Sequence, residues 1–148
     1  MYSFVLTLHN LLRWLVLILG IVAVVRAFIG WFGTSVWSEL DDRLGLGFTI
    51  SLDLQVLLGL LLYVFLSPIT THAFSNFGAA MADTNTRFFL VEHSFMMVLA
   101  IIVAHVGRSR ARKQSTDKSK FRATAIFFSI ALILVLAAIP WSRPLLPF

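Results

Sequence analysis

Residues 4–29 read FVLTLHNLLRWLVLILGIVAVVRAFI, and this first stretch of the chain decides the fold class. A helix needs roughly 20 mostly apolar residues to cross the hydrocarbon of a bilayer. Three further stretches of the same character follow at 47–66, 88–107 and 123–139. Four spans cannot close a barrel, so each must satisfy its own backbone as a helix. The sequence therefore predicts an all-α, integral membrane four-helix transmembrane bundle, with residues 1–148 forming a single domain.

The composition of the whole chain supports this interpretation. Of the 148 residues, 59% are hydrophobic and 13% are charged, and the mean hydropathy is +0.89. Soluble domains of this size have a more polar composition, and they cannot bury so much apolar surface. The lipid bilayer must therefore be the solvent for most of the surface. The net charge of +5 does not indicate a nucleic-acid partner, because seven of the twelve basic residues lie in one connection, 108–122.

That basic connection predicts the orientation of the chain. It contains one acidic residue, Asp117, against seven basic ones: Arg108, Arg110, Arg112, Lys113, Lys118, Lys120 and Arg122. Basic residues accumulate in the cytoplasmic connections of membrane proteins. We therefore expect the 108–122 loop to be cytoplasmic, and both termini and a loop over 67–86 to lie outside.

Ionisable residues inside the spans are candidate functional residues, because lipid makes them costly. They are His9, Arg13, Asp53, Glu92, His93 and His105. The chain has no cysteine, which excludes disulfides, iron–sulfur clusters and covalent haem attachment through a C-x-x-C-H motif. No set of residues indicates hydrolysis or group transfer. The sequence favours an electron-transfer protein over a stand-alone enzyme.

His9 and His93 are predicted to lie at matching depth. Each lies about five residues inside a helix that enters from outside, which is about 8 Å at 1.5 Å per residue. Two imidazoles that face each other from different helices can coordinate a haem iron on both faces. Arg13, one turn from His9, and Arg87, near His93, could neutralise the haem propionates, and Arg13 could instead pair with Glu92. The alternative is that His9 faces water and His93 serves helix packing.

Asp53 and His105 form a second candidate pair, nearer the cytoplasmic side. His105 follows His93 by twelve residues, which is about 18 Å along a helix and about 120° around it. That angle does not suit a second haem stacked beneath the first. An Asp–His pair at this depth could transfer protons for a quinone, or it could be a buried hydrogen-bonded pair, and the second interpretation is favoured. His72 is expected to be a solvated loop residue.

Two segments of the chain resemble a known family. The opening T-L-H-N-L-L-R-W-L-V-L-I-L-G resembles the first helix of bacterial four-helix b-type cytochromes of the cytochrome b561 kind. The segment R-F-F-L-V-E-H-S-F-M-M and the ending I-P-W are similar to short bacterial membrane proteins labelled cytochrome B. The resemblance implies one haem b in the inner membrane of a bacterial cell, with His9 and His93 as ligands. Some members have a histidine near the position of Asp53, and this departure argues against a second haem.

The resemblance also implies partners, namely other membrane subunits of a respiratory or photosynthetic electron-transfer complex. Two alternatives remain from the residues alone. One is a haem-free accessory subunit that stabilises a larger membrane complex. The other is a quinone-interacting subunit that uses Asp53 and His105.

Overall fold

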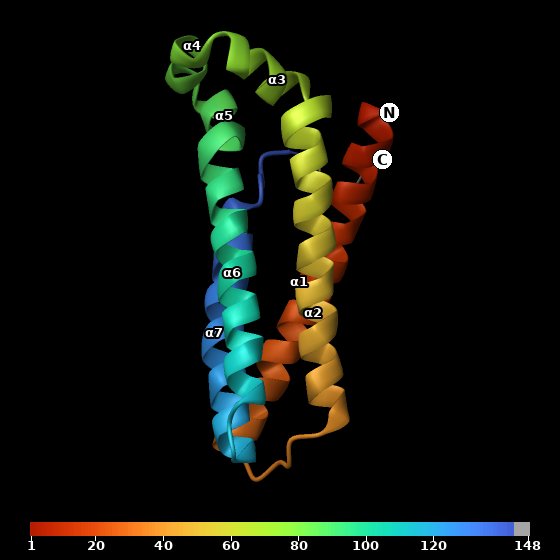
Figure 1. Ribbon diagram of the computed structural model, residues 1–148, viewed down its shortest axis with the longest axis vertical. Helices are drawn as coiled ribbons and strands as arrows, with labels where there is room; N and C mark the ends of the chain where they lie inside the picture. Colours follow the sequence, from red (N-terminus) through yellow and green to blue (C-terminus); the bar gives the residue numbers. More distant parts are fainter. Residues whose placement is uncertain (144–148) are drawn as a thin grey trace.

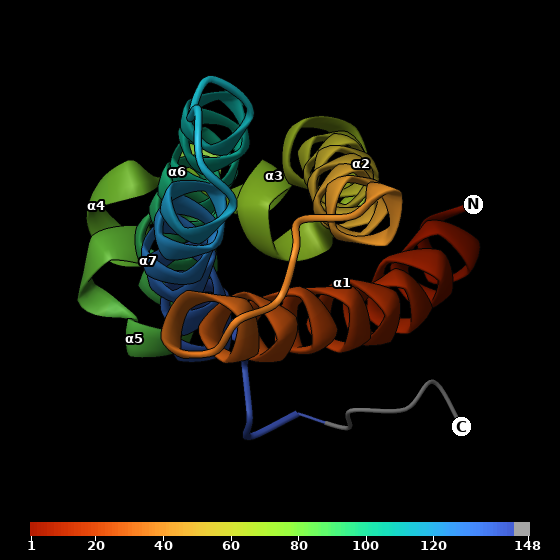
Figure 2. The same cartoon turned by 90° about the horizontal axis from the view of Figure 1, so that it is seen from below.

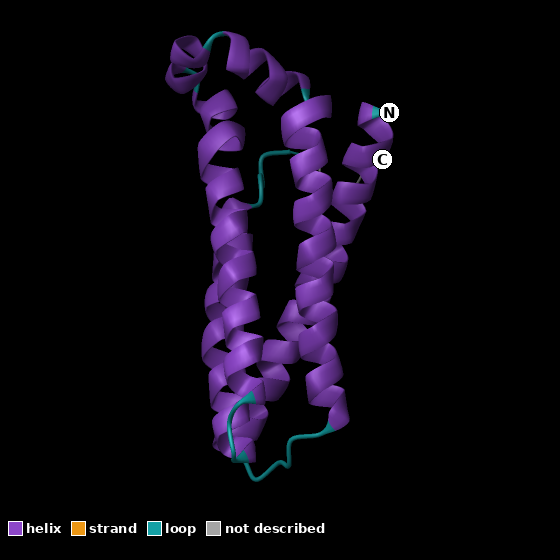
Figure 3. Ribbon diagram, in the orientation of Figure 1, coloured by secondary structure: helices purple, strands orange, loops and turns teal. Residues whose placement is uncertain are grey.

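The computed structural model describes residues 1–143, and within this range every regular element is a helix (Figures 1 and 3). The long helices are α1 (Tyr2–Phe32), α2 (Glu39–Leu61), α6 (His93–Arg112) and α7 (Asp117–Ala138). Two π-helical segments extend them: η1 (Leu62–Leu66) continues α2, and η2 (Phe88–Glu92) leads into α6. Three short helices connect η1 to η2: α3 (Pro68–Ser75), α4 (Phe77–Ala82) and α5 (Thr84–Arg87).

Four helical segments are long and apolar enough to cross a membrane: Tyr2–Phe32, Glu39–Leu66, Thr84–Arg112 and Asp117–Ala138. This confirms the all-α bundle of four apolar helices and makes the chain a multi-pass membrane protein. Most of the helices extend beyond the apolar stretches at one or both ends. Once a helix is nucleated, each further residue adds a backbone hydrogen bond, so the polar residues that flank a span remain helical.

The expectation of a loop over residues 67–86 is wrong, because the segment folds as α3, α4 and α5. Short polar side chains cap α4 and α5: Asn76 accepts from the Ala79 amide, and Asp83 accepts from the Thr86 amide at 2.8 Å. The Thr86 hydroxyl and amide both donate to the Asp83 carboxylate, and these bonds lower its pKa below the usual value. Such caps satisfy backbone groups that a loop would leave to water.

The four long helices form a ring in which α1 packs against α2 and α7, and α6 packs along α7 (Figure 2). The fourth side of the ring, between α2 and α6, is more loosely packed. Helices α1 and α6 are therefore diagonal neighbours across the bundle.

The core fills the half of the bundle near the α1–α2 and α6–α7 connections. Phe48 and Phe128 meet there with ring centres 5.0 Å apart, and both are fully buried. Helix α6 presents small buried residues along one face: Ala100, Ala104, Gly107 and Ala111. Small residues allow membrane helices to approach closely, which explains the intimate α6–α7 pair. The other half of the bundle, near the termini, is not filled in this way.

Candidate functional site

His9 of α1 and His93 of α6 meet across the diagonal of the bundle. Their ring centres are 6.4 Å apart, and the ring planes are inclined at 63°. The structure thus brings the two imidazoles together from different helices. Both side chains come from the half of the bundle near the termini, where the core packing ends.

The hydrogen bonds of His93 leave one ring nitrogen available. Its Nδ1 lies 2.7 Å from the carbonyl oxygen of Ala138. A carbonyl only accepts, so Nδ1 carries the proton and Nε2 keeps its lone pair. Ala138 is the last residue of α7, where carbonyls have no partner within the helix. Histidines that bind metals commonly donate their second nitrogen to a backbone carbonyl in this way.

The environment of His9 is different. Its Nδ1 is buried and has no hydrogen-bond partner. A Cβ added to Gly59 of α2 would lie 3.3 Å from His9 Cε1, so the absence of a side chain at Gly59 makes room for the ring. The Gln55 side-chain amide donates to the backbone carbonyl of His9 at 3.0 Å and ties α1 to α2 at this level. The result is an imidazole held by packing and open to a further polar partner.

The two π-helical segments lie beside this pair. In η2 the His93 amide bonds to the Phe88 carbonyl, and the Ser94 hydroxyl bonds to the Phe89 carbonyl at 2.9 Å. The Tyr63 hydroxyl of η1 donates to the Leu90 carbonyl of η2 at 3.0 Å, which joins the two segments. Short π-helical segments are frequent at functional sites, because the extra residue in the turn redirects the side chains that follow.

A cavity of about 930 Å³ surrounds the two histidines. Binding sites for small molecules and cofactors span about 300–1,000 Å³, so this cavity is large for so short a chain. Most of its walls are apolar, including Leu6, Val16, Leu52, Val56, Phe89 and Ile139. Its polar lining includes Gln55 and Tyr63 in addition to the two histidines. The site is therefore a mostly apolar cavity with two imidazoles in its lining.

Two arginines line the cavity, and only one of them was expected. Arg13 is 7% exposed and belongs to the lining. Arg143 also lines the cavity, with its guanidinium 4.3 Å from the ring centre of Phe89 and 3.4 Å from Asn85 Oδ1. Arg143 was not among the candidate residues of the sequence analysis. The I-P-W ending was the available signal, because Pro140 stops α7 and turns the chain back toward the cavity.

Arg87 lies elsewhere. It is absent from the cavity lining, and its Nε donates to Glu92 Oε1 at 3.0 Å. The sequence left open a pairing of Arg13 with Glu92. In the structure, Glu92 pairs with Arg87 instead.

Asp53 and His105 are brought together outside the cavity. His105 Nε2 lies 2.7 Å from Asp53 Oδ1, and the pair joins α2 to α6. The Asp53 side chain is 44% exposed and the His105 side chain is 51% exposed. The pair is therefore open to the membrane on the surface of the bundle. The expectation of a buried pair is therefore wrong. His72 is exposed on α3, as expected, although its segment is helical.

Among residues 1–143 no group of three or more His, Cys, Asp or Glu side chains could hold a metal ion. The cavity offers two imidazoles, which suits a metal whose other ligands come from an organic ring.

Comparison with known proteins identifies no family for this chain. No model of a known protein family matches the chain, and no curated protein or solved structure matches it either. The function has to be argued from the geometry of the cavity.

Proposed function

We propose that this chain is a membrane b-type cytochrome in which His9 and His93 hold one haem b, one imidazole on each face. The separation of the two rings carries the proposal. A metal–imidazole bond of about 2.0 Å, with the ring centre about 1.1 Å beyond the nitrogen, sets the centres of two opposed imidazoles about 6 Å apart. The observed separation is 6.4 Å.

The residues of the cavity fit a haem in three further respects. The apolar walls suit the porphyrin ring, and the volume of about 930 Å³ is at the upper end of the range for cofactors. The Nδ1–H of His93 is held by a backbone carbonyl, which leaves Nε2 as the coordinating atom. Arg13 and Arg143 are cations at the lining and match the two propionates.

The ligand set determines what such a site does. When bound, the haem supplies a one-electron redox couple. His9 and His93 would both hold the iron, so this pair of ligands would leave no coordination site for oxygen or a substrate. The apolar walls would contact the porphyrin ring, and the two arginines would balance the negative charge of the propionates. The site thus favours electron transfer over substrate activation.

The partners and the location form part of the same proposal. An electron carrier needs a donor and an acceptor, and we propose other membrane subunits of a respiratory or photosynthetic complex for these roles. The membrane is the inner membrane of a bacterial cell, and the 108–122 segment faces the cytoplasm. The concentration of basic residues in that segment supports this orientation.

The test is the visible absorption spectrum of the purified protein, recorded oxidised and reduced. We expect a low-spin b-type spectrum. His9→Ala or His93→Ala should abolish it or convert it to a high-spin form. His72→Ala and His105→Ala are matched controls and should preserve it, because neither side chain lines the cavity. A His93→Ala protein with an unchanged low-spin spectrum would refute the proposal, and the haem-free accessory subunit would become the better interpretation.

A second candidate function, the quinone-interacting subunit, is favoured by the pair of Asp53 and His105. Ionisable groups in a span usually face the bundle interior, yet this pair opens onto the membrane surface, where a lipid-soluble quinone diffuses. Oxidation of a hydroquinone releases two protons and two electrons; the pair would accept protons, and the proposed haem would have to take the electrons one at a time. Asp53→Asn should then reduce quinol-linked electron transfer and leave the haem spectrum unchanged. Unaltered turnover in that variant would leave Asp53 with a structural role.

A further inference from the structure

We propose that the end of the bundle formed by the start of α2, the end of α6 and the start of α7 binds the headgroups of anionic phospholipids. The binding site is centred on Arg108, Arg112 and Arg122, and we call it the basic end site. This inference is independent of the haem proposal, because it concerns the opposite end of the bundle.

The distribution of charge along the bundle is the first observation. The end that carries the basic end site holds four acidic residues against nine basic ones: Arg26, Arg43, Arg108, Arg110, Arg112, Lys113, Lys118, Lys120 and Arg122. Nine against four leaves +5, which equals the net charge of the whole chain. The three basic and three acidic residues elsewhere balance each other. The entire excess of positive charge is therefore concentrated at one end of the molecule.

Few of these charges are neutralised within the chain. Arg26 pairs with Asp41, and Arg43 pairs with Glu39. Within the range 1–143, five of the basic residues make no ion pair: Arg110, Lys113, Lys118, Lys120 and Arg122. These side chains are available to an anion from outside the protein.

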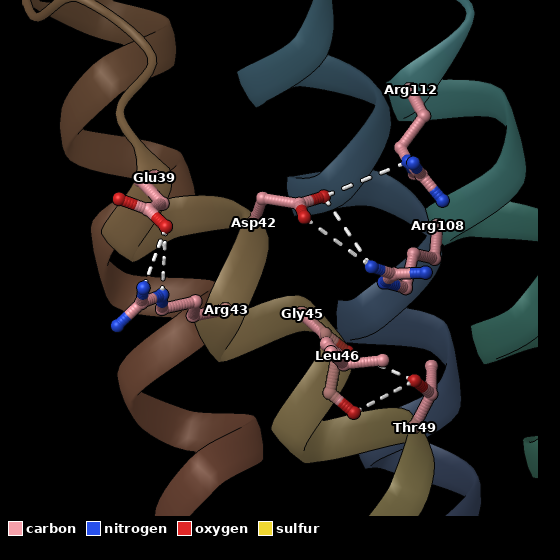
Figure 4. A network of polar contacts seen from close by, with 8 residues as sticks. All are labelled: Glu39, Asp42, Arg43, Gly45, Leu46, Thr49, Arg108 and Arg112. Carbon is pink, nitrogen blue, oxygen red and sulfur yellow. Dashed lines mark hydrogen bonds and ion pairs between the residues drawn. The ribbon is translucent and has the colours of Figure 1, made fainter.

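Arg108 and Arg112 share a single carboxylate. Figure 4 shows both side chains reaching from α6 toward Asp42 of α2. The closest nitrogen–oxygen distances are 3.4 Å for Arg108 and 3.8 Å for Arg112. Charge-assisted hydrogen bonds are shorter, about 2.7–2.9 Å, so neither arginine is closely bonded to Asp42. One carboxylate balances one guanidinium, which leaves the charge of the second without a counterion.

Arg122 lies at the same level as Arg112. Helices α6 and α7 are antiparallel, and Gly107 packs against Phe127. Five residues further along each helix, in opposite chain directions, are Arg112 and Arg122. Arg122 therefore extends the basic end site from α6 onto α7.

A phospholipid fits this surface better than a free anion. The site lies at the end of four membrane-spanning helices, where headgroups are found. Arg110 stacks its guanidinium 5.5 Å from the ring centre of Phe127, so cationic and apolar groups adjoin each other. A lipid presents the matching arrangement, a phosphate with acyl chains directly below it. Guanidinium groups bind phosphate with two parallel hydrogen bonds, which gives the contact its specificity.

The experiment measures lipid binding by the purified full-length chain in detergent micelles. Phosphatidylglycerol or phosphatidylcholine is added, and bound lipids are counted by native mass spectrometry while the unfolding temperature is recorded. We expect phosphatidylglycerol to be retained and to raise the unfolding temperature. Arg112→Gln should reduce the preference for phosphatidylglycerol by about fivefold, and adding Arg122→Gln should reduce it by about fivefold again.

Arg43→Gln is the matched control. Arg43 lies at the same end, is 72% exposed like the 62% exposed Arg112, and already has a partner in Glu39. We expect this variant to keep the wild-type lipid preference. Equal binding of the two lipids, an equal loss in Arg43→Gln, or the same stabilisation by inorganic phosphate would each overturn the proposal. The haem spectrum is a separate measurement, so either proposal can fail without the other.

Discussion

Replacing Gly107 with alanine tests how closely α6 and α7 pack. A Cβ at this position would lie 2.3 Å from Phe127 Cβ and 3.0 Å from Phe127 Cγ. Carbon atoms in van der Waals contact are about 3.5–4.0 Å apart, so the helices would have to separate locally by about 1.2–1.7 Å. The nearest atom is the first carbon of the phenylalanine side chain, and a change of rotamer cannot move it away.

The magnitude follows from two opposing contributions. Overpacking a close contact typically costs about 1–3 kcal/mol. Alanine is a better helix former than glycine, and this difference offsets about 1 kcal/mol of the overpacking cost. Since the clash involves atoms close to both backbones, we place its cost at the upper end of the range. We expect Gly107→Ala to lower the free energy of unfolding by about 1–2 kcal/mol.

The assay is unfolding in micelles, followed by the helical circular dichroism signal. Gly78→Ala is the control, because no atom lies within 4 Å of a Cβ added to Gly78 in α4. In a Phe127→Gly background, which removes the clashing Cβ, the same Gly107→Ala change should no longer destabilise the protein. A Gly107→Ala protein as stable as the wild type would refute the close packing described for α6 and α7.

Three further predictions concern the site, an ion pair with a buried carboxylate, and the topology. Gly59→Leu should displace the imidazole of His9 and abolish the low-spin spectrum in protein that remains helical by circular dichroism; an intact spectrum would contradict the role given to Gly59. Arg26→Gln should lower the free energy of unfolding by about 1.5–3 kcal/mol in chemical denaturation, because it removes the cation bonded at 2.8 Å to the buried carboxylate of Asp41. A reporter inserted in the 108–122 segment should be active in the cytoplasm, and one at the C-terminus in the periplasm; the reverse pattern would exclude the proposed orientation.

The sequence by itself determined the number and type of the membrane-spanning elements. Hydropathy is a property of consecutive residues, and lipid accepts only helices in so short a chain, so four apolar stretches suffice to predict four helices. The matching depth of His9 and His93 was also predictable, although their meeting depends on helix rotation as well. Depth in the membrane depends on the count of residues from the helix start, and that count can be read without knowing how the helices pack.

The remaining features of the site depend on how the helices are rotated and where the backbone bends. Residue types alone did not indicate that Arg143 would line the cavity while Arg87 turned to Glu92, because both arginines flank the same end of the bundle. The residue types also did not indicate that Asp53 would face the membrane. The direction of a side chain depends on how its helix is rotated.

Only the tertiary structure decided which nitrogen of His93 is available. The partner of its Nδ1 is the backbone carbonyl of Ala138, at the end of a different helix. Every residue has a carbonyl, so no sequence pattern marks this one. It becomes special because α7 ends there, which leaves the carbonyl without a helical partner, and because the close packing of α6 on α7 brings it to the imidazole.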